Sequence, residues 1–534
     1  MQPSRTILFP GWARMLAAVI VVSLLSDISW ARHPRDLWFY YPTNLQVAEN
    51  IDKLGPIWRR AAAAGYTRVL LADSKFVRLG TLPDFYFKNV DRVKALAREL
   101  HLQIVPAVFP IGYSNDLLFH NPNLAEGLPV VDAPFVVKGD VAITSVEKPI
   151  PFDVPDWKDE AVDITDGVAT VSAFAENARF VFKRQLPKYH AYHISVDIRT
   201  TDFIGEPRVA ALGKGRSLQY ANLGVKPTQD WTTHHVVFNT LDSDEVGIYL
   251  GAWGGGKGVL QWRNWKIEPA GLNNLLRRPG APFKIDGLIE GKDYEKVVDP
   301  ASGTIPYNGE FTVWHESPSI KLTKRIVDGT ILKVSYTHAI TIYDGQVSAC
   351  VSEPETDALL QDQAERMRKL WEANAYMMSH DEFRVGGWDA ACVARKQTMG
   401  QILASNVRKC TEWIAPNADT TAYVWSDMFD PFHNAVNDYY LVKGDLAGSW
   451  EGLDRKVGIV NWNFGKRDES LKFFADRGHK QVIAGFYDGP VENVAEWLIA
   501  AERVPGVTGI MYTTWRGDYG QLERFATVVQ THNQ

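Results

Sequence analysis

Cysteine is scarce in this sequence, which has three among 534 residues: Cys350, Cys392 and Cys410. An odd and widely spaced set is not the framework of a disulfide-stabilised domain, and no CxxC spacing indicates a zinc site. We therefore expect buried thiols, with one disulfide bond as the alternative. The sequence indicates no cofactor.

Basic blocks and long apolar runs are also missing from most of the chain. The net charge is −6 and no basic stripe occurs, which argues against a nucleic-acid partner. Beyond the first residues, no apolar segment approaches the length of a membrane span. The GxSxG motif of serine hydrolases and the glycine-rich fingerprint of dinucleotide-binding domains are absent as well.

The amino terminus has the pattern of a targeting segment. Arg5 and Arg14 precede a short apolar run over residues 15–25, and the small residues Ser29 and Ala31 lie on either side of Trp30. This arrangement predicts a signal peptide over residues 1–31 that is cleaved near Ala31. We expect the mature protein to be periplasmic or secreted, without a membrane span.

Aromatic residues are abundant, with 18 Trp, 20 Tyr and 24 Phe. Their flat apolar faces and polar edges suit contact with sugar rings, although many such residues also fill protein cores. The length predicts two or three domains, and the hydrophobic content of 46% is that of a globular protein with a large core.

Strands and helices alternate with short connections in two separate parts of the chain. Residues 35–41, 68–73 and 103–108 have the pattern of buried strands, with helices over residues 50–64 and 90–100 between them. The rhythm resumes at Glu353, and further strands are predicted at residues 376–379, 421–427, 457–462, 482–488 and 509–515. Eight such strands predict a (β/α)8 TIM barrel, formed by residues 32–129 and 350–534. An open doubly wound sheet is the alternative.

A different pattern separates the two parts of the barrel. Residues 130–270 contain short alternating strands and turns, which predict an antiparallel β-sandwich resembling a jelly roll. Residues 271–349 are mixed, and predict either a second β element or a long barrel loop. The sandwich carries several tryptophans that either bind carbohydrate or fill its core: Trp231, Trp253, Trp262 and Trp265.

Acidic and aromatic residues gather where the predicted barrel strands end, which is the face that carries TIM-barrel active sites. Asp381 and Glu382 come directly after an apolar strand, and two adjacent carboxyl groups in such a place suit acid/base chemistry. The strand ends contain Tyr41, Asp73, Phe109, His380, Asp381, Glu382, Trp425, Asp427, Trp462, Asn463, Tyr487, Asp488 and Trp515. His380, Asp381, Glu382 and His433 could also ligate a metal, but no HExxH or facial-triad spacing supports this, and we predict no metal site.

Glycoside hydrolysis matches this residue set. The reaction needs an acid for the leaving oxygen and a group that supports positive charge at the anomeric carbon. Glu382, beside Asp381 among apolar strand residues, is expected to have a raised pKa and to serve as the acid. Three assignments remain for the second group: the substrate's own acetamido oxygen, oriented by Asp381 and Tyr487; Asp488 as nucleophile; or Asp427 or Asp488 as the base that activates water.

The carboxyl-terminal half resembles the catalytic barrel of the family 20 β-N-acetylhexosaminidases. The resemblance is carried by the Asp381–Glu382 pair after the fourth strand, by VWSDM, by IVNWNFG and by Trp515, and near the start by Arg35 and the segment QIVP. It implies Glu382 as general acid, Asp381 as the residue that orients the acetamido group, and Tyr487 as donor to its oxygen. It also implies that Trp425, Trp462 and Trp515 line the subsite of the terminal sugar and that Arg35 anchors the sugar. As further substrate contacts at the strand ends we predict His380, Asp427 and Asp488.

The leading hypothesis is therefore an exported glycoside hydrolase that acts on an oligosaccharide or polysaccharide, with terminal N-acetylhexosamine as the sugar implied. One alternative is a retaining barrel glycosidase that uses Glu382 and Asp488. The other is a non-catalytic carbohydrate-binding protein on a degenerate barrel, in which the sandwich supplies much of the binding.

Overall fold

The computed structural model describes residues 36–146, 148–307 and 311–532, and its centre is a closed parallel barrel. Each barrel strand pairs in parallel with the next, and the last strand returns to the first, with Gly509 opposite Asp36. The predicted TIM barrel is confirmed. Its strands are, in order, β1 (Asp36–Pro42), β2 (Arg68–Ala72), β3 (Gln103–Val108), β17 (Ala375–Met378), β19 (Thr421–Trp425), β21 (Gly458–Asn461), β22 (Gln481–Ala484) and β23 (Val507–Tyr512).

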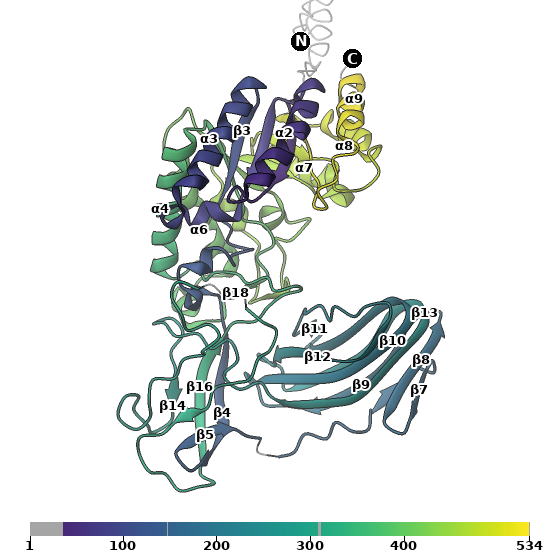
Figure 1. Cartoon of the computed structure of the whole chain (residues 1–534), viewed down its shortest axis with the longest axis vertical. Helices are drawn as coiled ribbons and strands as arrows, with labels where there is room; N and C mark the ends of the chain where they lie inside the picture. The colour runs from purple at the N-terminus through teal and green to yellow at the C-terminus, as the bar shows by residue number, and fades with distance from the viewer. Residues whose placement is uncertain (1–35, 147, 308–310, 533–534) are drawn as a thin grey trace, which may run out of the picture.

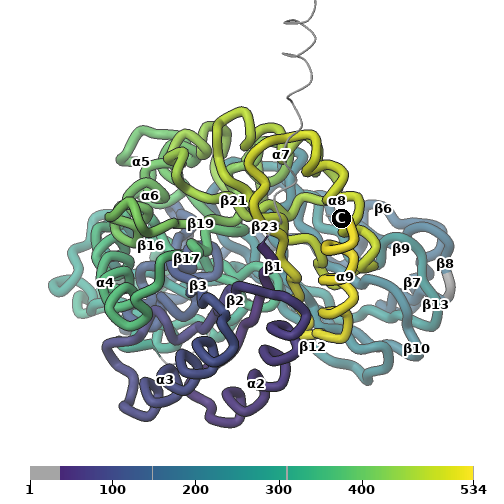
Figure 2. The backbone as a smooth tube through the Cα atoms, turned by 90° about the horizontal axis from the view of Figure 1, so that it is seen from above, coloured from purple at the N-terminus to yellow at the C-terminus, as the bar shows by residue number. Residues whose placement is uncertain are grey.

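Helices surround the barrel, as the view from above shows (Figure 2). Proline at the first turn of α4 and a capping box between Thr398 and Gln401 at the start of α6 fix where these two helices begin. No helix in the part of the chain that the structure describes is long and apolar enough to span a membrane. The outer layer contains α2 (Ala48–Ala63), α3 (Asp84–Glu99), α4 (Pro354–Trp371), α6 (Met399–Ile414), α7 (Arg467–Asp476), α8 (Asn493–Ala501) and α9 (Leu522–His532).

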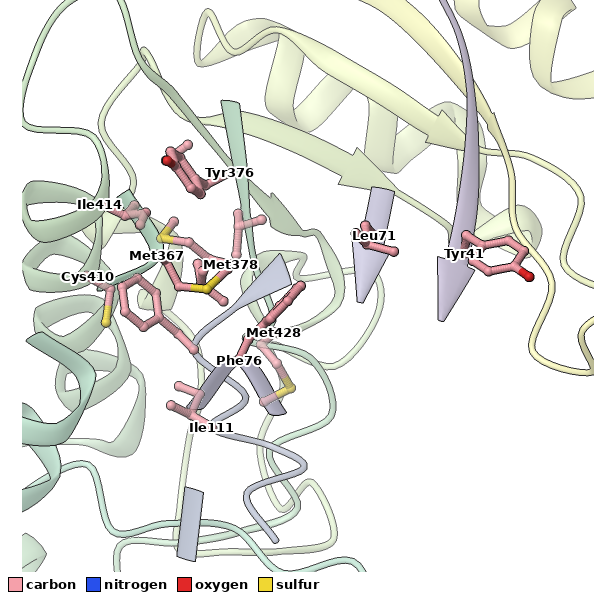
Figure 3. Close-up of a cluster of buried hydrophobic side chains, with 14 of the residues drawn as sticks. Tyr41, Leu71, Phe76, Ile111, Met367, Tyr376, Met378, Cys410, Ile414 and Met428 are labelled. Atoms are coloured by element: carbon pink, nitrogen blue, oxygen red, sulfur yellow. The ribbon is translucent and has the colours of Figure 1, made fainter. Parts of the chain in front are cut away.

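Alternation along the strands divides the barrel core into two layers. In β17, Tyr376 and Met378 face outward and join the layer between strands and helices, where Figure 3 shows them near Met367, Cys410 and Ile414. Met377, between them, belongs to a separate cluster inside the barrel. This period of two decides which residues beyond each strand reach the barrel mouth.

The inserted sandwich lies beside the barrel mouth and is built on two very long paired strands, β10 (Ala191–Gly213) and β13 (Glu245–Pro269) (Figure 1). Their register shifts near Ile204, so that one half of the pair joins one set of neighbours and the other half a second set. One half continues through β12 (Gln229–Asn239), β8 (Val168–Phe174) and β7 (Val162–Thr165). The other half continues through β11 (Arg216–Ser217), β9 (Ala178–Gln185) and β6 (Trp157–Lys158). Side chains from both halves meet in one core cluster.

A second, five-stranded antiparallel sheet joins the sandwich to the barrel (Figure 1). It takes two strands from the start of the predicted sandwich and three from the mixed segment that follows. Its strands are β4 (Leu128–Lys138), β5 (Val141–Thr144), β14 (Lys284–Ile285), β15 (Ile320–Lys321) and β16 (Ile331–His338). The mixed segment therefore supplies a second β element.

The two ends of the insert lie side by side on the barrel. Ala125 and Ala349 form an antiparallel bridge, the Glu126 amide donates to Ser348, and the Cys350 amide donates to Leu124. The three cysteines are buried and free, and the sulfur atoms of Cys350 and Cys392 are 3.8 Å apart. The expected buried thiols are thus confirmed.

Candidate active site

A cavity of about 500 Å³ opens at the carboxyl ends of the barrel strands. Leu70, Ala107 and Met377 from inside the barrel contribute to its lining, together with the carboxyl groups of Asp381 and Glu382. The aromatic and hydroxyl-bearing residues that line it are Tyr40, Tyr113, Ser379, Trp425, Trp462, Tyr487 and Trp515. A concave site of this size, mostly apolar with few polar groups, is typical of small-ligand binding.

Strand alternation places Asp381 in the cavity and turns His380 away from it. Asp381 continues the inward series of Met377 and Ser379. His380 is fully buried on the outer side, where its Nε2 lies 3.1 Å from Oδ1 of Asn406 on α6, and burial lowers its pKa to about 3. His380 was predicted as a sugar contact from its place at the strand end, but the structure does not bring it into the cavity.

Glu382 reaches the same cavity because the backbone breaks the alternation at this residue. Its φ is +49°, a left-handed conformation that a non-glycine residue adopts only when its surroundings hold it there. The Glu382 amide donates to Oδ2 of Asp427 at 2.9 Å, and its carbonyl accepts from Nε2 of Gln346 at 3.0 Å. Two adjacent carboxyl groups can therefore face one substrate.

Close backbone approach supports this break. A methyl group added at Gly112 would lie 1.8 Å from the carbonyl oxygen of Asp381, so only glycine fits there. The loop after β3 thereby runs directly against the Asp381–Glu382 segment, and the Ile111 amide donates to the Ser379 carbonyl at 3.3 Å.

The Glu382 side chain has two partners that the sequence did not suggest. Arg384 forms an ion pair with it at 2.6 Å, and the Tyr113 hydroxyl donates to its other oxygen. Arg384 is itself held by the Gln346 side chain and lies against the rings of Tyr343 and Tyr440. Gln346 and Tyr343 belong to the segment that returns from the insert, so residues far apart in sequence fix this carboxylate.

Burial and neighbouring negative charges raise the pKa values of Asp381 and Asp427. The pKa of Asp381 is raised from 3.8 to about 8, first by burial and then by the charges of Asp427 and Glu382. Burial also raises the pKa of Asp427 to about 6. Burial and the neighbouring charges therefore favour the protonated form of Asp381 in the free protein.

Asp427 is buried beside the cavity, where it supports residues of the site. Its side chain is fully buried, accepts from the Glu382 amide and the Asn434 side chain, and lies 3.4 Å from the indole nitrogen of Trp462. It does not line the cavity, although it was considered above as a sugar contact or as the base that activates water. Asp427 instead positions Glu382 and Trp462.

Aromatic rings form the walls opposite the carboxyl groups. Trp462 and Tyr487 stack with centroids 5.3 Å apart, and Trp515 lies 5.8 Å from Tyr487 and 5.9 Å from Trp425. Tyr40, and not the predicted strand-end residue Tyr41, closes the wall at 5.2 Å from Trp515. The three predicted tryptophans and Tyr487 are thus brought together. Arg35 lies outside the described residues.

Asp488 is turned toward the chain beyond β23. Its carboxylate accepts from the Thr514 hydroxyl at 2.5 Å, the Trp515 amide at 2.6 Å and the Arg516 amide at 3.2 Å. Tyr487 and Asp488 both have positive φ, which matches the conformation of Glu382 across the barrel. Asp488 therefore fixes the backbone that presents Trp515.

Replacing Asp488 with asparagine should weaken substrate binding more than turnover, because an amide cannot accept all three hydrogen bonds and Trp515 loses its position. We expect KM to rise about 5–10-fold, measured by steady-state kinetics, with Asp476→Asn on the exposed face of α7 as control. A fall in kcat of about 10³ or more at unchanged KM would instead assign Asp488 as a nucleophile.

The sandwich tryptophans have different environments. Trp262 is fully buried in the core, and Trp265 packs against that core. Trp231 lies beneath the guanidinium groups of Arg263 and Arg199. Trp253 lines an open groove of about 740 Å³ on the insert, which also contains Tyr220 and Tyr343. One of the four is therefore a core residue, and Trp253 faces a groove that adjoins Arg384 through Tyr343.

No protein-family model and no curated protein matches this sequence. Similar solved structures include the chitobiase of Flavobacterium johnsoniae, at 9% identity over 94% of this chain and 52% of that one, with a TM-score of 0.36. They also include a glycoside hydrolase family 20 β-N-acetylglucosaminidase, at 10% identity over 93% of this chain and 69% of that one, with a TM-score of 0.38. A CBM4 structure matches 21% of this chain and 76% of its own at 18% identity, with a TM-score of 0.17.

This chain thus spans about half the length of the chitobiase. Both enzymes carry the name of family 20, which is the family that the strand-end residues resemble. The function proposed below rests on the side chains of the cavity.

Proposed function

We propose that this protein is an exported glycoside hydrolase that removes a terminal sugar from a glycan. The observation that supports it is the cavity at the barrel mouth, where Asp381 and Glu382 face a wall of five aromatic rings. A sugar ring stacks on such faces, and a carboxyl pair supplies the proton transfer that cleavage requires.

Depth within the cavity separates the roles of the two acids. Glu382 keeps 22% of its side chain exposed and contacts Tyr113, which is itself 45% exposed, so it lies toward the rim where a leaving group would project. Asp381 lies deeper, following Met377 and Ser379 of the barrel interior. We therefore assign Glu382 as the proton donor and Asp381 as the partner of the buried part of the sugar.

The finer proposal is release of N-acetylhexosamine with help from the substrate's acetamido group. In this mechanism the acetamido oxygen attacks the anomeric carbon as Glu382 protonates the leaving oxygen, and water later opens the cyclic intermediate. Asp381 accepts the acetamido N–H, and the Tyr487 hydroxyl, whose pKa burial raises to about 12, donates to the oxygen. The engagement of Asp488 with three hydrogen bonds disfavours the alternative in which it is the nucleophile.

A panel of aryl glycosides tests the proposal. We expect kcat/KM for N-acetylglucosaminides or N-acetylgalactosaminides to exceed that for the matching sugars without an acetamido group by about 10² or more, since only the former carry the nucleophile. Cleavage confined to sugars without the acetamido group would refute the substrate-assisted mechanism. Sugar binding without any cleavage, measured by calorimetry, would favour the non-catalytic alternative.

A further inference from the structure

A second cluster of chemically reactive side chains lies away from the cavity, where the insert leaves and rejoins the barrel. Glu126 stands at the start of the insert and Cys350 just after its end, while Asp389 and Cys392 lie at and within the short helix α5 (Ala390–Ala394). One ligand atom from each of these four residues falls within 4.8 Å of every other, and all four residues are buried. Neither the barrel chemistry nor the sugar site uses them.

Two separations inside the cluster match those of a tetrahedral metal site. Zinc binds thiolate at about 2.3 Å and carboxylate oxygen at about 2.0–2.2 Å, so tetrahedral ligands lie about 3.8 Å apart for S···S and about 3.5–3.7 Å apart for S···O. The Cys350 and Cys392 sulfur atoms are 3.8 Å apart, and the Cys392 sulfur is 3.5 Å from Oε2 of Glu126. A disulfide bond, by contrast, needs about 2.05 Å between the sulfur atoms.

The charges of the cluster also favour a cation. Glu126 is 1% exposed, and among the described residues no lysine, arginine or histidine forms an ion pair with it. The nearby Arg278 is already committed, at 2.6 Å to Asp389 and at 2.8 Å to Glu353. Buried carboxylates without a cationic partner are costly, and those that persist are protonated, paired or bound to metal.

The neighbouring contacts fix the direction of the candidate ligands. Oδ1 of Asp389 accepts from the Cys392 amide at 2.9 Å, which caps α5, and Oε1 of Glu126 is 3.3 Å from the Trp388 amide. Such second contacts orient ligands before a metal arrives. Two sulfur and two oxygen donors in this geometry suit zinc better than magnesium or calcium, which take oxygen ligands in larger numbers.

We propose that Glu126, Cys350, Asp389 and Cys392 form a structural zinc site that joins the insert to the barrel. Binding releases the two thiol protons to solvent and leaves a closed site with four protein ligands. Because Asp389 and Cys392 follow Glu382 and Arg384 within the connection between β17 and α6, the metal would fix both ends of the insert and the connection that carries the proposed acid.

The test uses the full chain, reduced and freed of metal with a chelator. We expect one equivalent of Zn²⁺ per chain by elemental analysis after reconstitution. Co²⁺ should produce the near-ultraviolet absorption of a sulfur-to-cobalt charge transfer, and Zn²⁺ should raise the melting temperature by about 5 °C or more. The double variant Cys350→Ser/Cys392→Ser should lose both the metal and the absorption. Cys410→Ser, which removes the buried thiol of α6, should retain them.

The wild-type protein keeps the proposal falsifiable if the serine variants fail to fold. Folded, reduced wild type that binds no Zn²⁺ and gives no charge-transfer absorption with Co²⁺ would overturn it. A Cys350–Cys392 disulfide in the protein as isolated, detected by peptide mapping, would also overturn it and would assign the two thiols a covalent bond instead. Both measurements need no glycan and are independent of the proposed hydrolysis.

Discussion

Replacing Glu382 with glutamine is expected to lower kcat by about 10²–10⁴ on glycosides with alkyl leaving groups. Glutamine keeps the shape of the side chain and can still contact Tyr113 and Arg384, but it has no proton to give to the departing oxygen. Stopped assays on a disaccharide would measure the loss. Glu365→Gln on the exposed face of α4 provides a control of the same chemistry.

The leaving group separates a lost acid from a general disturbance of the site. An aryl group that departs readily as an anion needs little protonation, so Glu382→Gln should retain most of its activity on such a substrate. Equal losses on both substrates would show that Glu382 has a different role. Circular dichroism of the variant would establish that the fold is intact before either comparison is made.

Replacing Asp381 with asparagine should reduce hydrolysis by about 10² or more and at the same time stabilise the fold. The activity falls because asparagine cannot accept the acetamido N–H in the same way as a carboxylate. The stability rises because the folded protein no longer buries an ionisable group beside Asp427 and Glu382. Opposite signs for activity and stability in one variant are typical of a residue kept for function.

The pH dependence gives this prediction a definite sign. The pKa of Asp381 is about 8 in the folded protein against an ordinary value of 3.8, so the folded state binds the proton more tightly. The contribution of Asp381 to wild-type stability therefore falls as pH rises from about 4 to about 8, and Asp381→Asn escapes this loss. Thermal melts should show a gap of about 3–6 °C at pH 8 that closes near pH 4. An equal gap at all pH values would contradict the linkage, and the exposed Asp419→Asn serves as control.

The barrel was predictable because its signals are local. Each barrel strand is an apolar run bounded by a helix pattern, and all eight predicted runs correspond to strands of the closed sheet. The division of the insert into two sheets was not predictable in this way. β4 and β5 have the same local pattern as the sandwich strands, and only pairing with β16 and β15 assigns them to the other sheet.

The residues of the cavity were predicted from the strand ends, whereas the left-handed backbone that presents Glu382 was not. Trp425, Trp462 and Trp515 follow the inward series of their strands, whereas His380 occupies an outward position that a period of two could have identified. The left-handed step at Glu382 depends on Gly112 and Gln346, which approach from distant parts of the chain. No spacing near residue 382 contains that information.

Strand-end acids also show why residue type alone is a weak guide. Asp73 directly follows β2, in the position that suggested chemistry, yet it accepts hydrogen bonds from the Leu45 amide, the Lys75 amide and the Tyr86 hydroxyl. It secures the connection after β2 and does not line the cavity. Asp427 and Asp488 serve the backbone in a similar manner, which leaves Asp381 and Glu382 as the carboxyl groups that line it.

The bridge between Ala125 and Ala349 has a consequence for the order in which the chain folds. β3 must pair with β17, where Ala107 lies opposite Met377, and the entire insert separates the two strands in sequence. Closing so long a loop costs entropy and slows the search for contacts. Once the insert has folded, however, its ends are already adjacent, and the remaining loop is short. We therefore expect the insert to fold first. Its adjacent ends would then hold β3 and β17 close together, so that the two halves of the barrel can pair.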